Sequence, residues 1–380
     1  MQETKDGHSH NSQLQKEPFF SPLNVYRWRN FKKNHRGWWS LWFFLFFCFC
    51  SFSAEFIAND RPIIASYKGE LLFPVFFDYS DEKFGGNLAI ADFRDPLIQN
   101  EIAKHGWAVW PMVRYSYNTI VGNKTVALAP PFWLQSKEER CINYPLRSSD
   151  PECTISRWNW LGTDDLTRDI FARVLYGLRV SIIFSILLTL VSTIIGITVG
   201  AIQGYFGGWV DLIFQRFIEI WSSVPSLYVV IIMAAILAQG FWILLGVMLL
   251  FQWVTLVGVV RAEFLRARNF TYVDAARALG VPNSTIMIRH LLPNAMVAAL
   301  TYMPFLLTSG VSLLTSLDYL GFGLPAGYAS LGELMRQATT NLNAPWIGLT
   351  GFVIIAVMLS LLAFIGEAVR DAFDPRKTFQ

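Results

Sequence analysis

The chain has 380 residues, is 53% hydrophobic and carries a formal net charge of +3. Only 16% of its residues are charged, against about 25% in a soluble domain, and this argues against an ordinary soluble enzyme. The basic residues gather beside apolar segments, so the positive excess gives no sign of nucleic-acid binding.

Residues 1–36 form a polar N-terminal segment, in which Val25 to Arg36 is basic and aromatic. This pattern is typical of an interfacial helix that leads into a membrane span, although a simple stop-transfer flank carries the same residues. The polar leader is long for a signal peptide, and Ser53-Ala-Glu55 is a poor cleavage site. We therefore expect residues 37–56 to stay in the protein as its first transmembrane helix.

Long stretches of the chain contain no Asp, Glu, Lys or Arg. These stretches are residues 37–54, 180–210, 220–260, 290–317 and 337–366. A membrane helix needs about 20 apolar residues, so the third stretch holds two spans and each other stretch holds one. The expected spans are residues 37–56 and about 180–202, 216–237, 241–260, 294–317 and 346–366. The fold class is therefore an all-α polytopic membrane protein with six transmembrane helices.

The distribution of Lys and Arg near the span ends predicts the orientation. Basic residues crowd the segment before the first span, the loop 261–293 and the tail 367–380, whereas the loop 318–345 contains only Arg336. Both termini and the loop 261–293 are therefore expected in the cytoplasm.

Residues 57–160 separate the first span from the rest and are polar and apolar by turns, with many prolines. We expect a small irregular, partly β insertion outside the cytoplasm, in the periplasm. Cys141 and Cys153 fall in this oxidising region, where a disulfide between them is favoured over two free thiols.

Residues 161–366 contain the other five spans and two local patterns. Gly196, Gly200 and Gly204 recur every four residues in the second span, which favours close helix packing over direct lining of a pore. Pro225 and Pro304 lie inside the third and fifth spans, where kinks are tolerated.

The loop 261–293 predicts two short helices and a sharp turn. Thr271 and Asp274 have the three-residue spacing of a capping box, so a helix can begin at Tyr272. Ala275 and Ala276 favour continuation of that helix, and their side chains are small.

The end of this first helix is marked as clearly as its start. Gly280 suits a left-handed residue that ends the helix, and Pro282 prevents it from resuming. A second helix can start near Ser284 and enter the membrane at Pro293.

The sequence lacks the common motifs of catalytic and nucleotide-binding sites. The chain has no phosphate-binding Gly-x4-Gly-Lys-Ser/Thr motif, no His-Glu-x-x-His and no Gly-x-Ser-x-Gly. We therefore predict no catalytic residue, no metal site and no cofactor in this chain, and energy for any transport must come from another protein.

The spacing Asp274-Ala-Ala276, Gly280, His290 and Leu292-Pro293 resembles the EAA loop of ABC importer permeases, which docks into a cytoplasmic ATPase. Other segments are similar to the dipeptide and oligopeptide permease family: Leu161-Gly-Thr-Asp164, Arg168 to Gly177, Asp318 to Pro325, Ser330-Leu-Gly-Glu333 and Glu367 to Pro375. Phe84-Gly-Gly86 and Gly106 to Trp110, in the long insertion, resemble the YejE-type branch of that family.

The resemblance implies the type I ABC importer permease fold and a set of partners. These are a second, homologous, YejB-like permease subunit, one or more ATPase subunits that bind ATP and Mg, a periplasmic peptide-binding protein, and the lipid bilayer. The implied cargo is peptides, including microcin C. The coupling loop residues would be Thr271, Asp274, Ala275, Ala276, Gly280, His290 and Pro293.

Two other classes of function stay open on the sequence alone. A membrane enzyme would need clustered catalytic groups near the membrane, and none is evident. A periplasmic sensor or scaffold anchored by six spans would have no need of a loop that docks an ATPase.

Overall fold

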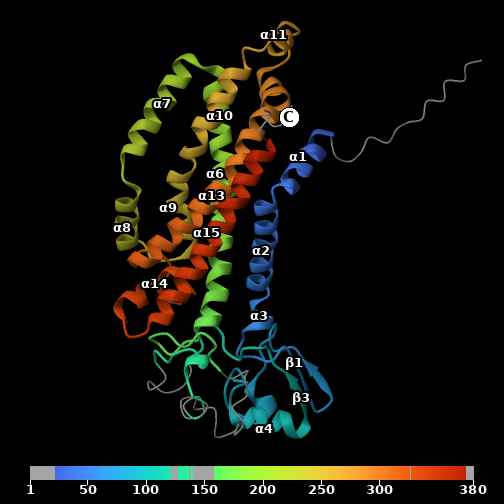
Figure 1. Cartoon of the computed structure of the whole chain (residues 1–380), viewed down its shortest axis with the longest axis vertical. Coiled ribbons are helices and arrows are strands. Elements are labelled where there is room, and N and C mark those ends of the chain that lie inside the picture. Colours follow the sequence, from blue (N-terminus) through green and yellow to red (C-terminus); the bar gives the residue numbers. More distant parts are fainter. Residues whose placement is uncertain are drawn as a thin grey trace, which may run out of the picture.

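The computed structural model describes residues 22–120, 127–136, 138, 140, 158–325 and 327–373. Long helices run side by side along the molecule, with a small domain at one end and helix α11 (Thr271–Ala278) at the other (Figure 1). The first helix α1 and the C-terminal end of α15 (Pro345–Phe373) lie at the same end as α11 (Figure 1).

The chain begins with α1 (Pro22–Lys33) and α2 (His35–Phe52), which are separated by Asn34. The Asn34 side chain accepts a hydrogen bond from the Gly37 backbone amide at 3.2 Å and so caps α2. Gly37 lets α2 meet α15 closely, because a Cβ there would lie 2.1 Å from the Cβ of Ala368. The N-terminal and C-terminal helices are thereby packed together.

Among the residues that the structure describes, four helical segments are long and apolar enough to cross a membrane. They are α6 (Ile170–Phe206), α9 with α10 (Phe241–Gln252 and Val254–Ala267), the run Asn283–Leu320, and α15. The run comprises α12 (Asn283–Thr285), a π-helical turn η6 (Ile286–Leu291) and α13 (Leu292–Leu320).

The expected third span, residues 216–237, is not one kinked helix. It consists of α7 (Gly208–Ser223) and α8 (Ser226–Ile236), bent by 67° at a break that contains Pro225. Proline has no amide hydrogen and disfavours helix in the residue before it, so the helix stops there rather than bending. The pair makes a fifth span if the two helices are counted together.

The remaining expected span, residues 37–56, corresponds to α2. This helix has 18 residues, which at 1.5 Å each reach about 27 Å, slightly less than a hydrocarbon core of about 30 Å. By length and composition the described residues thus give four spans, or five with the bent pair, and the count of six stays a prediction.

The segment between α2 and α6 contains a three-stranded antiparallel sheet with the order β2-β1-β3. β1 (Ile64–Tyr67) lies between β2 (Glu70–Leu72) and β3 (Gly106–Val109), and Ala65 pairs with Leu72 on one side and Ala108 on the other. Lys68 and Gly69 both have positive φ, as a tight two-residue hairpin turn requires.

Short helical elements complete this segment. They are α3 (Ala54–Ile57), η1 (Asp81–Phe84), α4 (Pro96–His105) and η3 (Phe132–Leu134). Helix α4 packs Ile98 and Ile102 into a core with Tyr67, Phe84 and Phe93. The proposed disulfide between Cys141 and Cys153 lies outside the described residues.

After α13 the chain folds into α14 (Leu331–Thr340), which packs against α13, α15 and α6. α6 contacts α10 and α13 along its length, so it is the central helix of the bundle. Its two ends carry the features that matter for function.

Candidate functional site

Helix α11 ends in a turn set by Gly280, whose φ is +74°. The Gly280 amide donates to the Arg277 carbonyl at 3.0 Å, and the Val281 amide donates to the Ala276 carbonyl at 3.1 Å. These two hydrogen bonds form a Schellman motif, which satisfies carbonyl groups that the helix end would otherwise leave unpaired. The turn expected at Gly280 is therefore present, and Pro282 follows it.

The start of α11 differs from the expected capping box. The helix begins at Thr271, Phe270 is its N-cap, and no side-chain capping hydrogen bond is formed there. The Phe270 carbonyl accepts from Val273 at 2.9 Å and from Asp274 at 3.3 Å, so Thr271 is already inside the first turn. Asp274 instead lies 3.7 Å from Arg277 in an exposed ion pair.

One face of α11 is fixed to the helical bundle. Val273 and Ala276 are buried in an apolar cluster that also contains Phe264 of α10, Ile286 of η6 and Ala201 of α6. Apolar burial of this kind holds a short helix that would be marginal on its own.

Polar contacts hold the same loop to the end of α6. The Tyr205 hydroxyl donates to Asn283 Oδ1 at 2.6 Å, and the Arg277 guanidinium lies over the Tyr205 ring at 5.4 Å. Arg268 donates to the carbonyl oxygens of Gly204 and Tyr205, each at 3.4 Å. A cation at these last carbonyls also complements the negative end of the helix dipole.

The other face of α11 is presented to solvent. Leu279 is 82% exposed and Tyr272 is 40% exposed, and Asp274 and Ala275 lie on the same open side. Tyr272 and Leu279 are therefore large apolar side chains that the described helical bundle leaves uncovered. His290, in η6, is half-buried and Pro293 is exposed, both outside this tip.

Gly196, Gly200 and Gly204 of α6 face α10. A Cβ at Gly196 would lie 2.9 Å from the Trp253 carbonyl oxygen, and one at Gly200 would lie 2.8 Å from that of Val257. At Gly204 the Cβ would lie 2.5 Å from the Cβ of Phe264. The stripe thus lets α6 and α10 approach closely, just beside the base of the coupling loop.

The opposite end of α6 contains a buried network of charges that the sequence did not reveal. Arg168 Nε donates to Asp164 Oδ2 at 2.7 Å and Arg168 also lies 3.2 Å from Glu333 on α14. Arg173 pairs with Glu333 as well and approaches Asp164 at 3.6 Å. The negative charges of two carboxylates and the positive charges of two guanidinium groups therefore neutralise each other in a site that is buried from water.

Further hydrogen bonds extend this network along α14 and the end of α13. Gln337 donates to Glu333 Oε1 at 3.1 Å, and the Ser330 hydroxyl donates to Asp318 Oδ2 at 2.5 Å. Asp318 Oδ1 accepts from the Leu324 amide at 2.7 Å. The segments 161–177, 318–325 and 330–333 are thereby brought to one place.

Asp169 caps α6 at the edge of the network. Its carboxylate accepts from the Ala172 amide at 2.8 Å and from the Asn159 side-chain amide at 2.7 Å. Burial raises the pKa of this carboxyl to about 6, and the two hydrogen bonds oppose the rise.

Two family models match parts of this chain. The family described as "Binding-protein-dependent transport system inner membrane component" matches residues 196–379, and the "N-terminal TM domain of oligopeptide transport permease C" matches residues 23–81. The first match contains α11, Gly280 and α14.

Curated relatives extend the match over nearly the whole chain. The peptidoglycan transport system permease protein YejE of Agrobacterium fabrum is 61% identical over 366 residues, with 96% of each chain covered. The inner membrane ABC transporter permease protein YejE of Escherichia coli is 49% identical, with 94% of this chain and 98% of that protein covered. The oligopeptide transport system permease protein OppC of Bacillus subtilis is 33% identical over 58% of this chain and 73% of its own length.

Proposed function

The chain belongs to the family of binding-protein-dependent inner-membrane permeases, in its YejE-type branch, and from this membership we propose that it gates peptide import through α11. As a member of that family it is a multi-pass permease subunit of an ABC importer, with a role in transport rather than catalysis. We propose that α11 and the turn at Gly280 receive a cytoplasmic ATPase and pass its movement to α6.

The observation that carries this proposal is the two-sided character of α11. Val273 and Ala276 fix one side of the helix to α6 and α10, while Leu279 and Tyr272 are left exposed at its tip. A docking element needs both properties, because it must bind a partner and transmit force to the bundle.

The proposed partners follow from the family. A second, YejB-like permease subunit would complete the path across the membrane, and a periplasmic peptide-binding protein would deliver cargo. ATP and Mg would be bound and ATP hydrolysed by the partner ATPase. The relatives' names refer to oligopeptides and to peptidoglycan, so we propose peptides as cargo, including peptidoglycan-derived peptides and peptide antibiotics of the microcin C kind.

We further propose six spans with both termini in the cytoplasm. α1, the C-terminal end of α15 and α11 lie at one end of the molecule, and the sheet domain lies at the other, which supports this orientation (Figure 1). In a background with the native cysteines replaced by serine, a cysteine at Asn100 should react with a membrane-impermeant maleimide added to the periplasm. A cysteine at Asn283 should stay unlabelled, and the reverse pattern would overturn the orientation.

Two leucines give a matched test of docking. Leu279 is 82% exposed at the tip of α11, and Leu342 is 81% exposed in the turn between α14 and α15, far from α11 (Figure 1). Leu279→Asp should abolish copurification of the ATPase and peptide uptake at normal membrane abundance, because a charge cannot enter an apolar groove unpaired. Leu342→Asp should leave both unchanged. Normal ATPase binding by Leu279→Asp would make the docking proposal untenable.

A second test uses the backbone of the turn. A Cβ at Gly280 meets nothing within 4 Å, so Gly280→Val is opposed only by the positive φ, at about 1–3 kcal/mol. We expect normal abundance but ATP hydrolysis uncoupled from uptake. Gly240→Val is the control, since that site is equally open but has an extended φ of −175°. Asp274→Ala should reduce uptake weakly and Asp274→Glu should be tolerated.

A further inference from the structure

Two neighbouring spans of the bundle are interrupted at the same depth. α8 runs from the break at Pro225 to the turn before α9, and α9 returns from that turn to Gln252, with α10 following after Trp253. The 11 residues of α8 and the 12 of α9 reach about 16–18 Å, roughly half of a hydrocarbon core of about 30 Å. The Trp221 indole, just before the first break, donates to the Leu250 carbonyl at 2.8 Å, which joins the two interruptions near the middle of the membrane.

An amide and a hydroxyl meet at this level. The Gln252 side-chain amide donates to Ser309 Oγ on α13 at 3.0 Å, and Ser309 is exposed while Gln252 is half-buried. A glutamine side chain has two donor hydrogens and one acceptor oxygen, so this bond uses only part of its capacity. Within the described part of the chain, Gln252 Oε1 and the hydroxyl hydrogen of Ser309 have no hydrogen-bond partner.

Other exposed hydroxyls in the spans are satisfied within their own helix. Thr198 donates to the Ile194 carbonyl at 2.8 Å, and Ser316 donates to the Ser312 carbonyl at 2.8 Å. Lipid offers no hydrogen bond, so a hydroxyl that faces lipid must find its acceptor in the protein. The Gln252–Ser309 pair keeps open donor and acceptor groups instead, and it is therefore suited to a polar surrounding.

The neighbouring α7 also presents polar groups. Arg216 and Glu219 are 77% and 47% exposed, and Ser222 and Ser223 are exposed directly before the break. Charged side chains inside membrane spans generally face the protein interior or a water-filled cavity. The open polar groups of α7 therefore indicate water on the loop side of Gln252.

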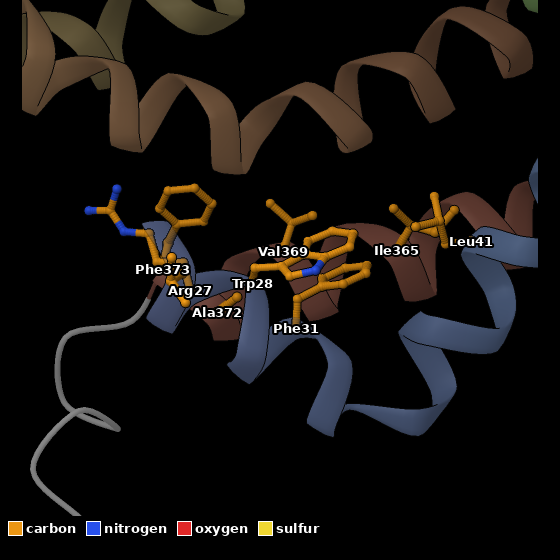
Figure 2. Close-up of a pocket in the computed structure, with 9 residues that line it drawn as sticks. Arg27, Trp28, Phe31, Leu41, Ile365, Val369, Ala372 and Phe373 are labelled. Atoms are coloured by element: carbon orange, nitrogen blue, oxygen red, sulfur yellow. The ribbon is translucent and has the colours of Figure 1, made fainter. Parts of the chain in front are cut away.

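A groove between α1, α2 and α15 has the opposite character (Figure 2). Its lining is aromatic and aliphatic apart from Arg27, whose guanidinium already lies 4.6 Å from the Phe373 ring centroid. Such a surface selects no ligand. The open hydrogen-bonding groups lie instead between α9 and α13, at the Gln252–Ser309 pair.

We propose that Gln252 and Ser309 bind the backbone of a peptide in transit, with a peptide group paired to the Gln252 side-chain amide. The proposal rests on the role of the chain in peptide transport and not on the docking of α11. A side-chain amide carries the same donor and acceptor groups as a peptide bond, so the two are complementary. Residues 220–260 and 290–317 contain no Asp, Glu, Lys or Arg, so this level of the spans selects no charge on the cargo. Backbone recognition lets one site accept peptides of many sequences.

Cysteine labelling tests whether the site meets water and peptide. In a background with the native cysteines replaced by serine, Ser309→Cys is compared with Thr198→Cys in cells that carry the full transporter. A charged methanethiosulfonate reagent is added with a tryptic peptide mixture or with the same mixture hydrolysed to amino acids. We expect Ser309→Cys to be modified, and the peptides to slow the reaction several-fold more than the amino acids do. Thr198→Cys should stay unmodified.

Uptake measurements test the amide itself. Gln252→Leu removes the amide at similar size, and peptide uptake should fall by about three- to tenfold, as the loss of one hydrogen bond predicts. Gln252→Asn keeps an amide and should recover part of the loss. Gln239→Leu makes the same change in the turn between α8 and α9 and should leave uptake near the wild-type rate. Membrane abundance and ATPase copurification should be normal in all three variants.

Three outcomes would overturn the proposal. No modification of Ser309→Cys would mean that lipid or a helix of the second permease subunit covers the pair. Modification that peptides do not slow would mean a wet surface that binds no cargo. Equal uptake by Gln252→Leu and wild type would mean that the amide is not used. The labelling result stands even if Gln252→Leu fails to accumulate, and ATPase docking by Leu279 is measured separately.

Discussion

The two ends of α6 are held by different interactions: buried ion pairs at one end and close apolar packing at the other. At the ionic end, near Ile170, buried charges from three segments pair with one another, and Arg173 is fully buried. At the loop end, near Phe206, glycines and small apolar groups let α10 approach, and the neighbouring α11 leaves Leu279 exposed. A buried ionic network has few acceptable geometries, whereas an exposed apolar tip adapts to a partner. The first end is suited to hold one geometry, and the second leaves an apolar surface uncovered.

α6 connects these ends as a single helix. Its 37 residues give a length of about 55 Å at 1.5 Å per residue. Tyr205 bonds to the coupling loop through Asn283, and Arg173, nine turns away along the same helix, bonds to Glu333 on α14. α6 is therefore one continuous helix that contacts the loop after α11 at one end and α14 at the other.

The largest effect is expected at the ionic end. Glu333→Ala removes the carboxylate that Arg168 and Arg173 share, and breaking a buried pair costs about 3–5 kcal/mol. The purified complex should show a much lower half-unfolding temperature and the membranes a lower amount of the protein. Glu333→Gln should recover part of the loss, because its amide oxygen still accepts one hydrogen bond.

The control for this prediction is an exposed pair. Arg216 and Glu219 lie 2.6 Å apart on α7, with side chains 77% and 47% exposed. Glu219→Ala should cost less than about 1 kcal/mol, because water screens the pair. Similar losses for Glu219→Ala and Glu333→Ala would contradict the contrast between buried and exposed charge.

A moderate effect is expected where α6 meets α10. Gly204→Ala places a Cβ 2.5 Å from the Cβ of Phe264, and such overpacking costs about 1–3 kcal/mol. Gly246→Ala, in α9, meets nothing within 4 Å and should be neutral or stabilising by about 0.5–1 kcal/mol. The half-unfolding temperatures of the two variants should therefore shift in opposite directions or differ clearly. Equal temperatures would mean that the α6–α10 contact relaxes without cost.

Local sequence patterns predicted the loop end better than the ionic end. The turn needs only Gly280 and Pro282, so three neighbouring residues contain the information. The capping box failed because the Phe270 carbonyl accepts the first hydrogen bonds of α11, and the helix starts one residue before the position that the Thr271–Asp274 spacing suggests.

The ionic end could not be found from local spacing. Arg173 and Glu333 are 160 residues apart in the chain, and no periodic pattern connects them. Both belong to segments that resemble the oligopeptide permeases, so the resemblance marked the parts of the network without their contacts. The charge-free stretch that predicted this span began at residue 180, whereas α6 begins at Ile170 and carries Arg173 in its first turn.

The effect expected at Asp169 depends on pH. Burial raises the pKa of this carboxyl to about 6, above its ordinary value of 3.8, so the folded state holds the proton more tightly than the unfolded state. Stability therefore falls as the pH rises from about 4 to about 6, and the loss is complete above that.

Asp169→Asn removes this titration and keeps the helix cap. The Asn159 Oδ1 atom, which is buried and makes no hydrogen bond in the structure, can accept a hydrogen bond from the new side-chain amide. The variant should gain half-unfolding temperature relative to wild type between pH 5 and pH 7, whereas Asp169→Ala should lose the cap and about 1 kcal/mol at every pH. A constant difference between wild type and Asp169→Asn across this range would show that Asp169 does not titrate there.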